Sequence, residues 1–214
     1  MSFQTRPNEV LLQNVRVSYV HLLEPYQNQN QPGQEPKYSC MILVPKSDTA
    51  QVQALQTAIE ATIAEARTKH GAKVPAMPKT PIHDGDGYTP GGKEYGEECK
   101  GHFVFNASQV AKYKPEVVDL QGQPLTEPSQ VYSGMYVNVL VNFYFYNNQS
   151  SGIGAGLGPV QKVRDGEPLG GGAPASAASV FGAPQGSAAN VFGGAAATQL
   201  GEAQAINPLT GQPM

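Results

Sequence analysis

Hydrophobic and polar residues alternate in several short segments of the chain, and this period of two is typical of β-strands. In residues 10–19 the alternation gives one face of a strand three residues: Val15, Val17 and Tyr19. Residues 37–45 are rich in apolar and β-branched side chains and predict a second, mostly buried strand. The prolines, amides and glycine of residues 24–36 predict a loop between the two strands.

The interval from Asp48 to His70 has the period of an amphipathic helix instead. Its apolar residues recur at spacings of three and four: Val52, Leu55, Ile59, Ile63 and Ala66. Asp48 is suited to cap the free amides at the start, and Gln51 completes the pattern of a capping box. Gly71 supplies the left-handed residue that commonly ends a helix. The pattern predicts one helix that packs on the sheet by a single face.

Strand-like segments return after a long loop. Residues 74–101 contain four prolines and many glycines, and a loop of this length is often functional. The strand candidates that follow are residues 102–107, 115–120, 135–146 and 158–164. This order predicts a mainly β domain with one helix over residues 1–170. Residues 171–214 are dominated by Gly, Ala, Ser, Pro and Gln with one charge, Glu202, which predicts a flexible, disordered tail.

Charge and composition narrow the function classes. The chain has 14 basic and 17 acidic residues, a formal net charge of −3 and a pI of about 5.8, so a polyanion would have to be bound by local clusters. Two cysteines without an N-terminal apolar run favour a reducing cytoplasm. The longest apolar-leaning stretch, residues 135–146, is shorter than the ~20 residues that span a membrane, so no membrane partner is expected.

The segment 135–146 is the most informative for function. Its odd positions are apolar and predict the core face, whereas Tyr136, Tyr144 and Tyr146 lie at even positions on the outer face. Exposed rings would stack on the bases of any single strand, at about 1–3 kcal/mol per base. The alternative is that these tyrosines pack beneath the long loop.

Basic residues next to aromatic residues recur along the chain, and each pair would combine a phosphate contact with a stacked base. The residues assigned to such contacts are Lys37, Tyr38, Lys100, Lys112, Tyr113 and Lys114. Lys93 and Tyr95 form a further pair of this kind. Such pairs also arise by chance at strand ends, where the stem of a lysine covers an aromatic ring.

Other motifs predict no catalytic or cofactor site. The glycine run of residues 152–158 lacks the ending of a phosphate-binding loop and is better interpreted as a glycine-rich hairpin or bulge that allows close approach. Asp84 and Asp86 have a spacing that suits Mg²⁺ or Ca²⁺, but a tight Asp-Gly turn is favoured. Cys99 and His102 have the spacing of half a zinc site without a second half. We therefore expect no metal, no cofactor and no enzymatic activity.

Several segments together carry a family resemblance: VRVSY (15–19), KYSCMILVPKSDT (37–49), HDGD (83–86), KPEVVD (114–119), YSGMYVNV (132–139) and GLGPVQKVRDGEPLGG (156–171). They resemble the tailed-phage single-stranded-DNA-binding proteins of the Enc34 type, a family long catalogued as a domain of unknown function. The resemblance implies an OB-fold-like β-barrel that binds ssDNA without sequence preference. Two departures are His83, where the family has a basic residue before Asp-Gly-Asp, and a tail that holds only Glu202 where several such proteins end in an acidic recruiting tail.

The predicted function is binding and protection of ssDNA during phage DNA replication, recombination or repair, in the cytoplasm of the host cell. The tail would contact phage or host replication and recombination proteins, and both a monomer and a homodimer fit this interpretation. One alternative is a virion or interaction component without nucleic-acid affinity, suggested by the balanced charge and by AASVFG (177–182) returning as AANVFG (188–193). Another is a metal-dependent nuclease that uses Asp84 and Asp86.

Overall fold

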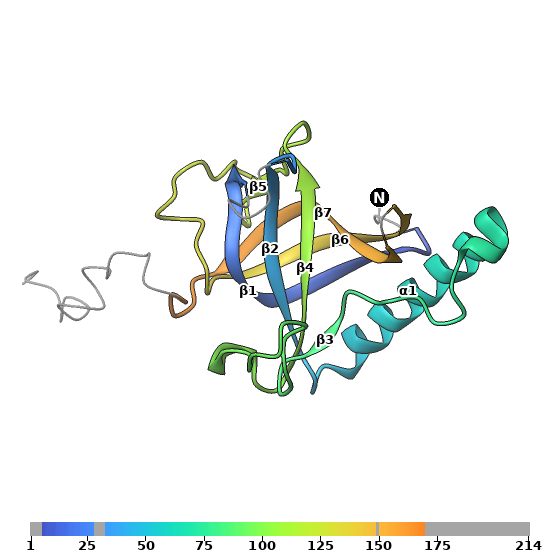
Figure 1. The fold of residues 1–214 in the computed structure, drawn as a ribbon. Helices are drawn as coiled ribbons and strands as arrows, with labels where there is room; N and C mark the ends of the chain where they lie inside the picture. The colour runs from blue at the N-terminus through green and yellow to red at the C-terminus, as the bar shows by residue number, and fades with distance from the viewer. Residues whose placement is uncertain (1–5, 28–32, 149, 170–214) are drawn as a thin grey trace, which may run out of the picture. The chain divides into compact units, whose positions relative to one another are not determined.

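The computed structural model describes residues 6–27, 33–148 and 150–169. In this part of the chain the structure is mainly β, with one α-helix beside the sheet (Figure 1). No helix among these residues is both long and apolar enough to cross a membrane. The predicted tail, residues 171–214, lies outside the described residues.

Strand β1 (Glu9–Tyr26) is the centre of the sheet, because it pairs antiparallel with both β2 (Lys37–Pro45) and β6 (Tyr136–Asn147). β2 pairs in turn with β4 (His102–Val110), and β6 with β7 (Ser151–Arg164), both antiparallel. A parallel pairing of β4 with β7 closes the sheet into a barrel of five long strands. This strand order with its single helix is OB-like and confirms the predicted fold class.

Two short strands extend the sheet beyond the barrel. β3 (His83–Asp84) pairs with β4, and β5 (Val117–Val118) runs parallel to β7. β5 is shorter than the strand predicted over residues 115–120. β7 is longer than the strand predicted over residues 158–164, because it also includes the glycine run of residues 152–158.

Two residues of β1 interrupt its regular alternation. Asn14 and Tyr19 both have a φ of 49°, and the register with the neighbouring strands shifts at each of them. As a result Ser18 is buried, whereas Tyr19 is 62% exposed. The prediction that Tyr19 lies on the same face of the strand as Val15 and Val17 is therefore wrong. An irregularity of the backbone, which residue alternation does not reveal, turns its side chain outward.

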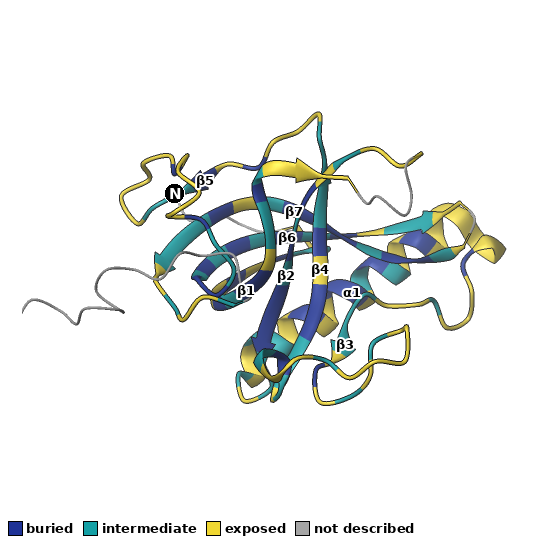
Figure 2. Cartoon of the chain, turned by 60° about the vertical axis from the view of Figure 1, so that its left-hand side comes forward, coloured by how far each residue is buried: buried dark blue, intermediate teal, exposed yellow. Residues whose placement is uncertain are grey.

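The hydrophobic core consists of side chains from the five strands of the barrel and from α1. Figure 2 shows buried residues, in dark blue, recurring along these strands. The predicted core face of β6 is buried at Met135, Val137, Val139, Val141 and Phe143, and only partly buried at Phe145. The Phe143 ring lies against that of Phe105 from β4, with centroids 6.1 Å apart. Cys40 of β2 is buried in the same core. Burying one such large side chain stabilises the fold by roughly 1.5–3 kcal/mol.

Helix α1 (Thr49–His70) packs against β1, β6 and β7. Its buried residues are Leu55, Ala58, Ile59, Thr62 and Ala66, while Val52 and Ile63 are partly buried beside them. The Asp48 carboxylate accepts a hydrogen bond from the Gln51 N–H at 3.1 Å, as predicted. The Gln51 side chain bonds the backbone of Gln13, so it ties the helix to β1. Gly71 follows with a φ of 55° and ends the helix.

The long loop packs on the outer face of β2 and β4. It follows one short 3-10 turn, η1 (Gly71–Lys73), and contains a second, η2 (Glu97–Cys99). Cys99 is buried against Leu43 and Val104, which point away from the barrel interior and form a small second core. Among the described residues, the loop thus covers the outer face of these two strands at one end and leaves the other end uncovered.

Candidate nucleic-acid interface

A groove crosses the outer face of the barrel. It consists of two adjoining hollows of ≈ 760 Å³ and ≈ 470 Å³. Both are lined by Met41, Asn106 and Ser108, so they meet over β2 and β4. These are the second and third strands of the barrel, and OB folds bind oligonucleotides on the face of those two strands.

The smaller hollow lies beside the connection from β1 to β2 and is lined by aromatic rings. Tyr19 projects into it from the irregular point of β1. The rings of His21 and Tyr26 stack on each other, with centroids 4.6 Å apart and an interplanar angle of 23°. Lys37 lines the same hollow at the start of β2. Burial lowers the pKa of His21, so its imidazole is neutral near pH 7.

The larger hollow contains two tyrosines of β6 that lie across glycines of β7. Tyr144 pairs with Gly154, and Tyr146 pairs with Gly152. A Cβ atom on Gly154 would lie 2.6 Å from Cζ of Tyr144, so only glycine leaves room for the ring. Tyr144 is still 44% exposed, which leaves ring surface open to the groove. The glycine run thus permits a close approach, as predicted, and the approaching groups are side chains of the neighbouring strand.

The long loop forms one wall of the larger hollow. The backbone oxygen of Lys79 accepts a hydrogen bond from the Ile153 N–H at 2.8 Å, which joins the loop to β7. Tyr95, near the other end of the loop, lines the same hollow and packs against the small second core. Because Tyr144 lies beside this wall and is partly exposed, the loop does not seal it off.

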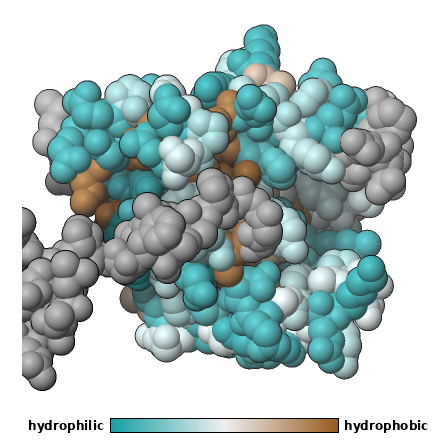
Figure 3. All heavy atoms as spheres, turned by 90° about the vertical axis from the view of Figure 1, so that its left-hand side faces the viewer, coloured by the Kyte–Doolittle hydropathy of each residue, from teal (hydrophilic) through white to brown (hydrophobic). Residues whose placement is uncertain are grey.

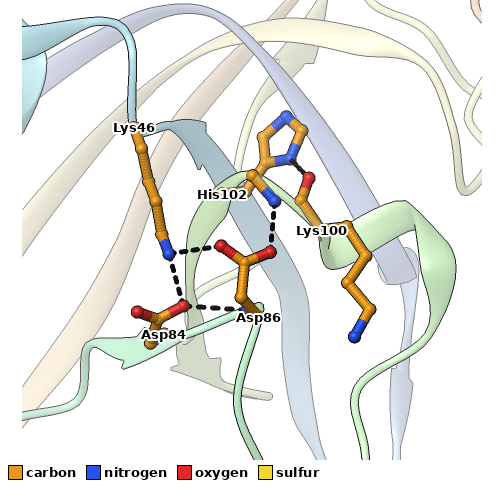
Figure 4. Close-up of polar contacts among 6 residues, drawn as sticks. Lys46, Asp84, Asp86, Lys100 and His102 are labelled. Atoms are coloured by element: carbon orange, nitrogen blue, oxygen red, sulfur yellow. Dashed lines mark hydrogen bonds and ion pairs between the residues drawn. The ribbon is translucent and has the colours of Figure 1, made fainter.

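Three charged residues, Lys46, Asp84 and Asp86, fasten the loop to the end of β2, and we call them the latch (Figure 4). The Lys46 Nζ atom lies 2.5 Å from Oδ1 of Asp84 and 2.6 Å from Oδ2 of Asp86. Asp86 also accepts a hydrogen bond from the Gly101 N–H at 2.7 Å. Hydrogen bonds from Lys46 lower the pKa of both carboxyl groups, so both are ionised at neutral pH.

The latch involves Asp84 and Asp86, the two carboxylates whose spacing would suit Mg²⁺ or Ca²⁺. The Lys46 ammonium lies between the two carboxylates, where a divalent cation would have to lie. The Gly87 N–H donates to the Asp84 backbone oxygen at 3.1 Å, which closes the tight turn that the sequence favours. Gly85 has no room for a Cβ atom against the backbone oxygen of Cys99. Among the residues with described positions, no three His, Cys, Asp or Glu side chains are grouped as metal ligands.

Cys99 and His102, which have the spacing of half a zinc site, make other contacts in the structure. Burial raises the pKa of the Cys99 thiol to about 11, which disfavours the thiolate that a zinc ion binds. The Nδ1 atom of His102 bonds the backbone oxygen of Lys100 at 2.7 Å.

The structure brings together only some of the predicted DNA contacts. Lys37, Tyr144 and Tyr146 line the groove, whereas Tyr38 is only 7% exposed and belongs to the core. Tyr136 lies at the opposite end of β6 from Tyr144.

The remaining predicted lysines lie at the two ends of β4. Lys100 precedes this strand, beside the latch. Lys112, Tyr113 and Lys114 follow it, next to the start of β2, where the Ala111 N–H donates to the backbone oxygen of Pro36. Their role in DNA contacts stays a prediction.

Among the groove residues that are absent from the predicted contacts are Tyr19, His21, Tyr26 and Lys79. No simple signal reveals Tyr19, because its orientation depends on an irregular backbone. The partnership of Tyr144 with Gly154 could have been found by aligning the even positions of β6 with the glycines that alternate in β7.

Comparison with known proteins gives a consistent result. The family model described as Enterobacter phage Enc34, ssDNA-binding protein, matches residues 8–191. The putative protein p50 of Acyrthosiphon pisum secondary endosymbiont phage 1 is 35% identical over 178 residues, which cover 78% of this chain and 90% of p50.

Two solved structures are also similar. The single-stranded DNA-binding protein from bacteriophage Enc34, in complex with ssDNA, is 27% identical with a TM-score of 0.62, over 78% of this chain and 97% of that one. The single-stranded DNA-binding protein gp2.5 encoded by bacteriophage T7 is 18% identical with a TM-score of 0.50, over 77% of this chain and 91% of that one. The likeness to gp2.5 concerns the fold alone.

Proposed function

We propose that this chain, which belongs to the family of the Enterobacter phage Enc34 ssDNA-binding protein, binds single-stranded DNA in the groove over β2 and β4. The observation that carries the proposal is the position of aromatic rings at both ends of a groove on the OB-fold binding face. Bases would stack on Tyr19 and Tyr26 at one end and on Tyr144 at the other. Stacking accepts any base, which accounts for binding without sequence preference.

The groove has few positive charges, and this sets the expected salt dependence. Lys37 and Lys79 line it, whereas the Lys46 ammonium is already engaged by two carboxylates. Each phosphate neutralised on a single strand contributes about −0.7 to the slope of log affinity against log salt. Two lysines therefore predict a shallow slope from the groove, and Lys100, Lys112 and Lys114 would steepen it where they reach a longer strand.

The biological role follows from this binding. We propose that the protein covers and protects ssDNA in phage DNA replication, recombination or repair in the cytoplasm of the host cell, without catalysing a reaction and without a cofactor. The relatives named above as ssDNA-binding proteins support this role. The tail, residues 171–214, would offer contacts to replication or recombination proteins.

Titration with oligo-dT tests the proposal, because the chain has ten tyrosines and no tryptophan. Binding should quench the tyrosine emission, and Tyr19→Ala should weaken binding. Tyr88→Ala is the matched control, since Tyr88 is 67% exposed on the long loop and lines neither hollow. A wild-type protein that ignores oligo-dT even at low salt would contradict the proposal and favour a virion component.

A further inference from the structure

A second group of positive charges surrounds Tyr136, at the opposite end of β6 from the tyrosines of the groove. The Cζ atom of Arg164 lies 3.3 Å from the centroid of the Tyr136 ring, and that of Arg16 lies 6.0 Å from it. Arg16 donates hydrogen bonds to the backbone oxygens of Gly134 and Glu167, at 3.3 Å and 2.7 Å. We call Arg16, Arg164 and Tyr136 the arginine site.

Neither arginine of this site is paired with an acid. Within the described ranges no carboxylate lies within 4.0 Å of either guanidinium. The adjacent Asp165 is engaged elsewhere, since its carboxylate lies 2.7 Å from the Lys162 Nζ atom and accepts a hydrogen bond from the Tyr132 hydroxyl at 2.8 Å. Glu167 is exposed and adds one negative charge nearby, so the site keeps a positive excess.

Both guanidiniums are held in place before any ligand arrives. Arg164 lies on the tyrosine ring and donates from Nε to Oδ1 of Asn14 at 3.3 Å, while Arg16 is fixed by two backbone oxygens. A planar guanidinium held this way loses little freedom on binding and presents paired N–H groups that match a phosphate. Because Arg164 covers the Tyr136 ring, a base does not have free access to that face.

The arginine site is separate from the groove. Tyr136 precedes Tyr144 by eight positions on one face of β6, which at roughly 3.3 Å per residue places them about 26 Å apart.

Figure 3 shows the molecule from the side where β7 ends, and its visible described surface is mostly hydrophilic with only narrow hydrophobic strips. Such a surface suits a charged, hydrated ligand better than an apolar protein partner.

We propose that Arg16 and Arg164 form a phosphate-binding site for the backbone of a DNA strand that continues beyond the groove. The inference rests on the proposed function and assigns Tyr136 a supporting role, in which its ring positions Arg164 and does not stack on a base. Long strands would then contact both the groove and the arginine site, whereas short ones would contact the groove alone.

Oligonucleotide length separates the two sites, because OB folds cover about 4–16 nucleotides each. The affinities of wild type and Arg164→Gln are compared for oligo-dT of about 6 and about 30 nucleotides, with folding checked by thermal melting. We expect Arg164→Gln to weaken the long oligonucleotide about three- to tenfold and to reduce its salt slope by about 0.7, and to leave the short one unchanged. Lys73→Gln is the matched control, since it removes one charge from an exposed turn after α1.

Two further variants distinguish a positioned guanidinium from bulk charge. Arg164→Lys keeps the charge but loses the planar group, so we expect it to recover only part of the lost affinity. Tyr136→Leu removes the supporting ring and should weaken only the long oligonucleotide. Full recovery by Arg164→Lys, together with no effect of Tyr136→Leu, would overturn the assigned role of the ring.

The outcomes separate this inference from the proposed function. If wild type binds both oligonucleotides and Arg164→Gln changes neither, the arginine site is wrong and the groove stands. If Arg164→Gln weakens both equally, the site is part of the groove and the inference of a second contact fails. If wild type binds neither oligonucleotide, both proposals fail.

Discussion

The two ends of β6 carry the same residue on the same face, yet they offer different chemistry. Tyr144 lies across Gly154 of β7 and is 44% exposed. Tyr136 is covered by the guanidinium of Arg164, which occupies the position a base would take. The alternation of β6 fixes which side of the strand both rings are on. The neighbouring strand β7 decides whether a ring face is open, because it supplies glycine at one end and arginine at the other.

Replacing Tyr144 or Tyr136 by alanine should give the largest difference in DNA affinity between two variants. Tyr144→Ala should remove one stacked base and weaken the binding of a short oligo-dT by about 1–3 kcal/mol, or about 5- to 150-fold. Tyr136→Ala should leave the short oligonucleotide unaffected, since its ring is covered by Arg164. Fluorescence anisotropy at fixed salt measures both. If both variants lose the same affinity for the short oligonucleotide, the Arg164 guanidinium moves off the Tyr136 ring and a base stacks there.

A smaller effect is expected from the glycine beneath the open ring. Gly154→Ala would place a methyl group 2.6 Å from Cζ of Tyr144, so the ring must tilt away from β7. We expect about three- to tenfold weaker binding and a loss of stability of about 1 kcal/mol. Gly91→Ala is the control, since the nearest atom to its Cβ is 3.9 Å away. If Gly154→Ala and Gly91→Ala both bind DNA as tightly as wild type, the Tyr144 ring does not need to lie against β7 for binding.

Release of the latch should affect the groove more weakly. Lys46→Met leaves Asp84 and Asp86 facing each other without their ammonium, so amides of residues 83–101 should exchange faster at neutral pH. With the wall loosened, affinity should fall about two- to threefold. Lys69→Met is the control, because Lys69 pairs with Glu65 on α1 and lines neither hollow.

The latch also predicts a pH dependence with a definite sign. Lys46 lowers the pKa of Asp84 and Asp86 below the ordinary carboxyl value. The contribution of the two carboxylates to the stability of the loop is therefore complete above that value. It is lost as the pH falls through the lowered pKa values and the carboxylates take up protons. Protection of the loop in wild type should therefore decline in acid, and the decline should be smaller in Lys46→Met, where only the backbone hydrogen bonds to the two carboxylates remain.

The smallest effect concerns His21 in the other half of the groove. Because burial lowers its pKa, the ring is neutral near pH 7 and gains a positive charge only in acid. Binding of DNA should therefore tighten about twofold as the pH falls from neutrality through the lowered pKa of His21. His21→Phe should abolish this increase while it keeps an aromatic ring against Tyr26. A gain that persists in His21→Phe would assign the effect to another group.

The sequence predicts those features that depend on neighbours along the chain. The helix, the buried face of β6 and strand β2 follow from local periodicity and appear where they were expected. Tyr38 could also have been placed in the core, because it is in phase with the buried residues Cys40 and Ile42. Pairing it with Lys37 as a surface contact overlooked that phase.

The rest depends on contacts between distant segments. Tyr19 faces the groove because of a positive φ, for which alternation gives no warning. Lys46 is 38 residues from Asp84, so only the folded chain reveals that the HDGD motif holds a lysine. The covering of Tyr136 by Arg164 likewise arises from the pairing of β6 with β7.

The burial of both cysteines has a practical consequence for the protein's chemistry. Cys40 and Cys99 are free thiols, and burial raises their pKa values to about 12 and about 11. The thiolate is the form that oxidants and alkylating reagents attack, and it is scarce for both groups at neutral pH. The two thiols of the folded protein should therefore react only slowly with peroxide and iodoacetamide, and no covalent dimers should form in air.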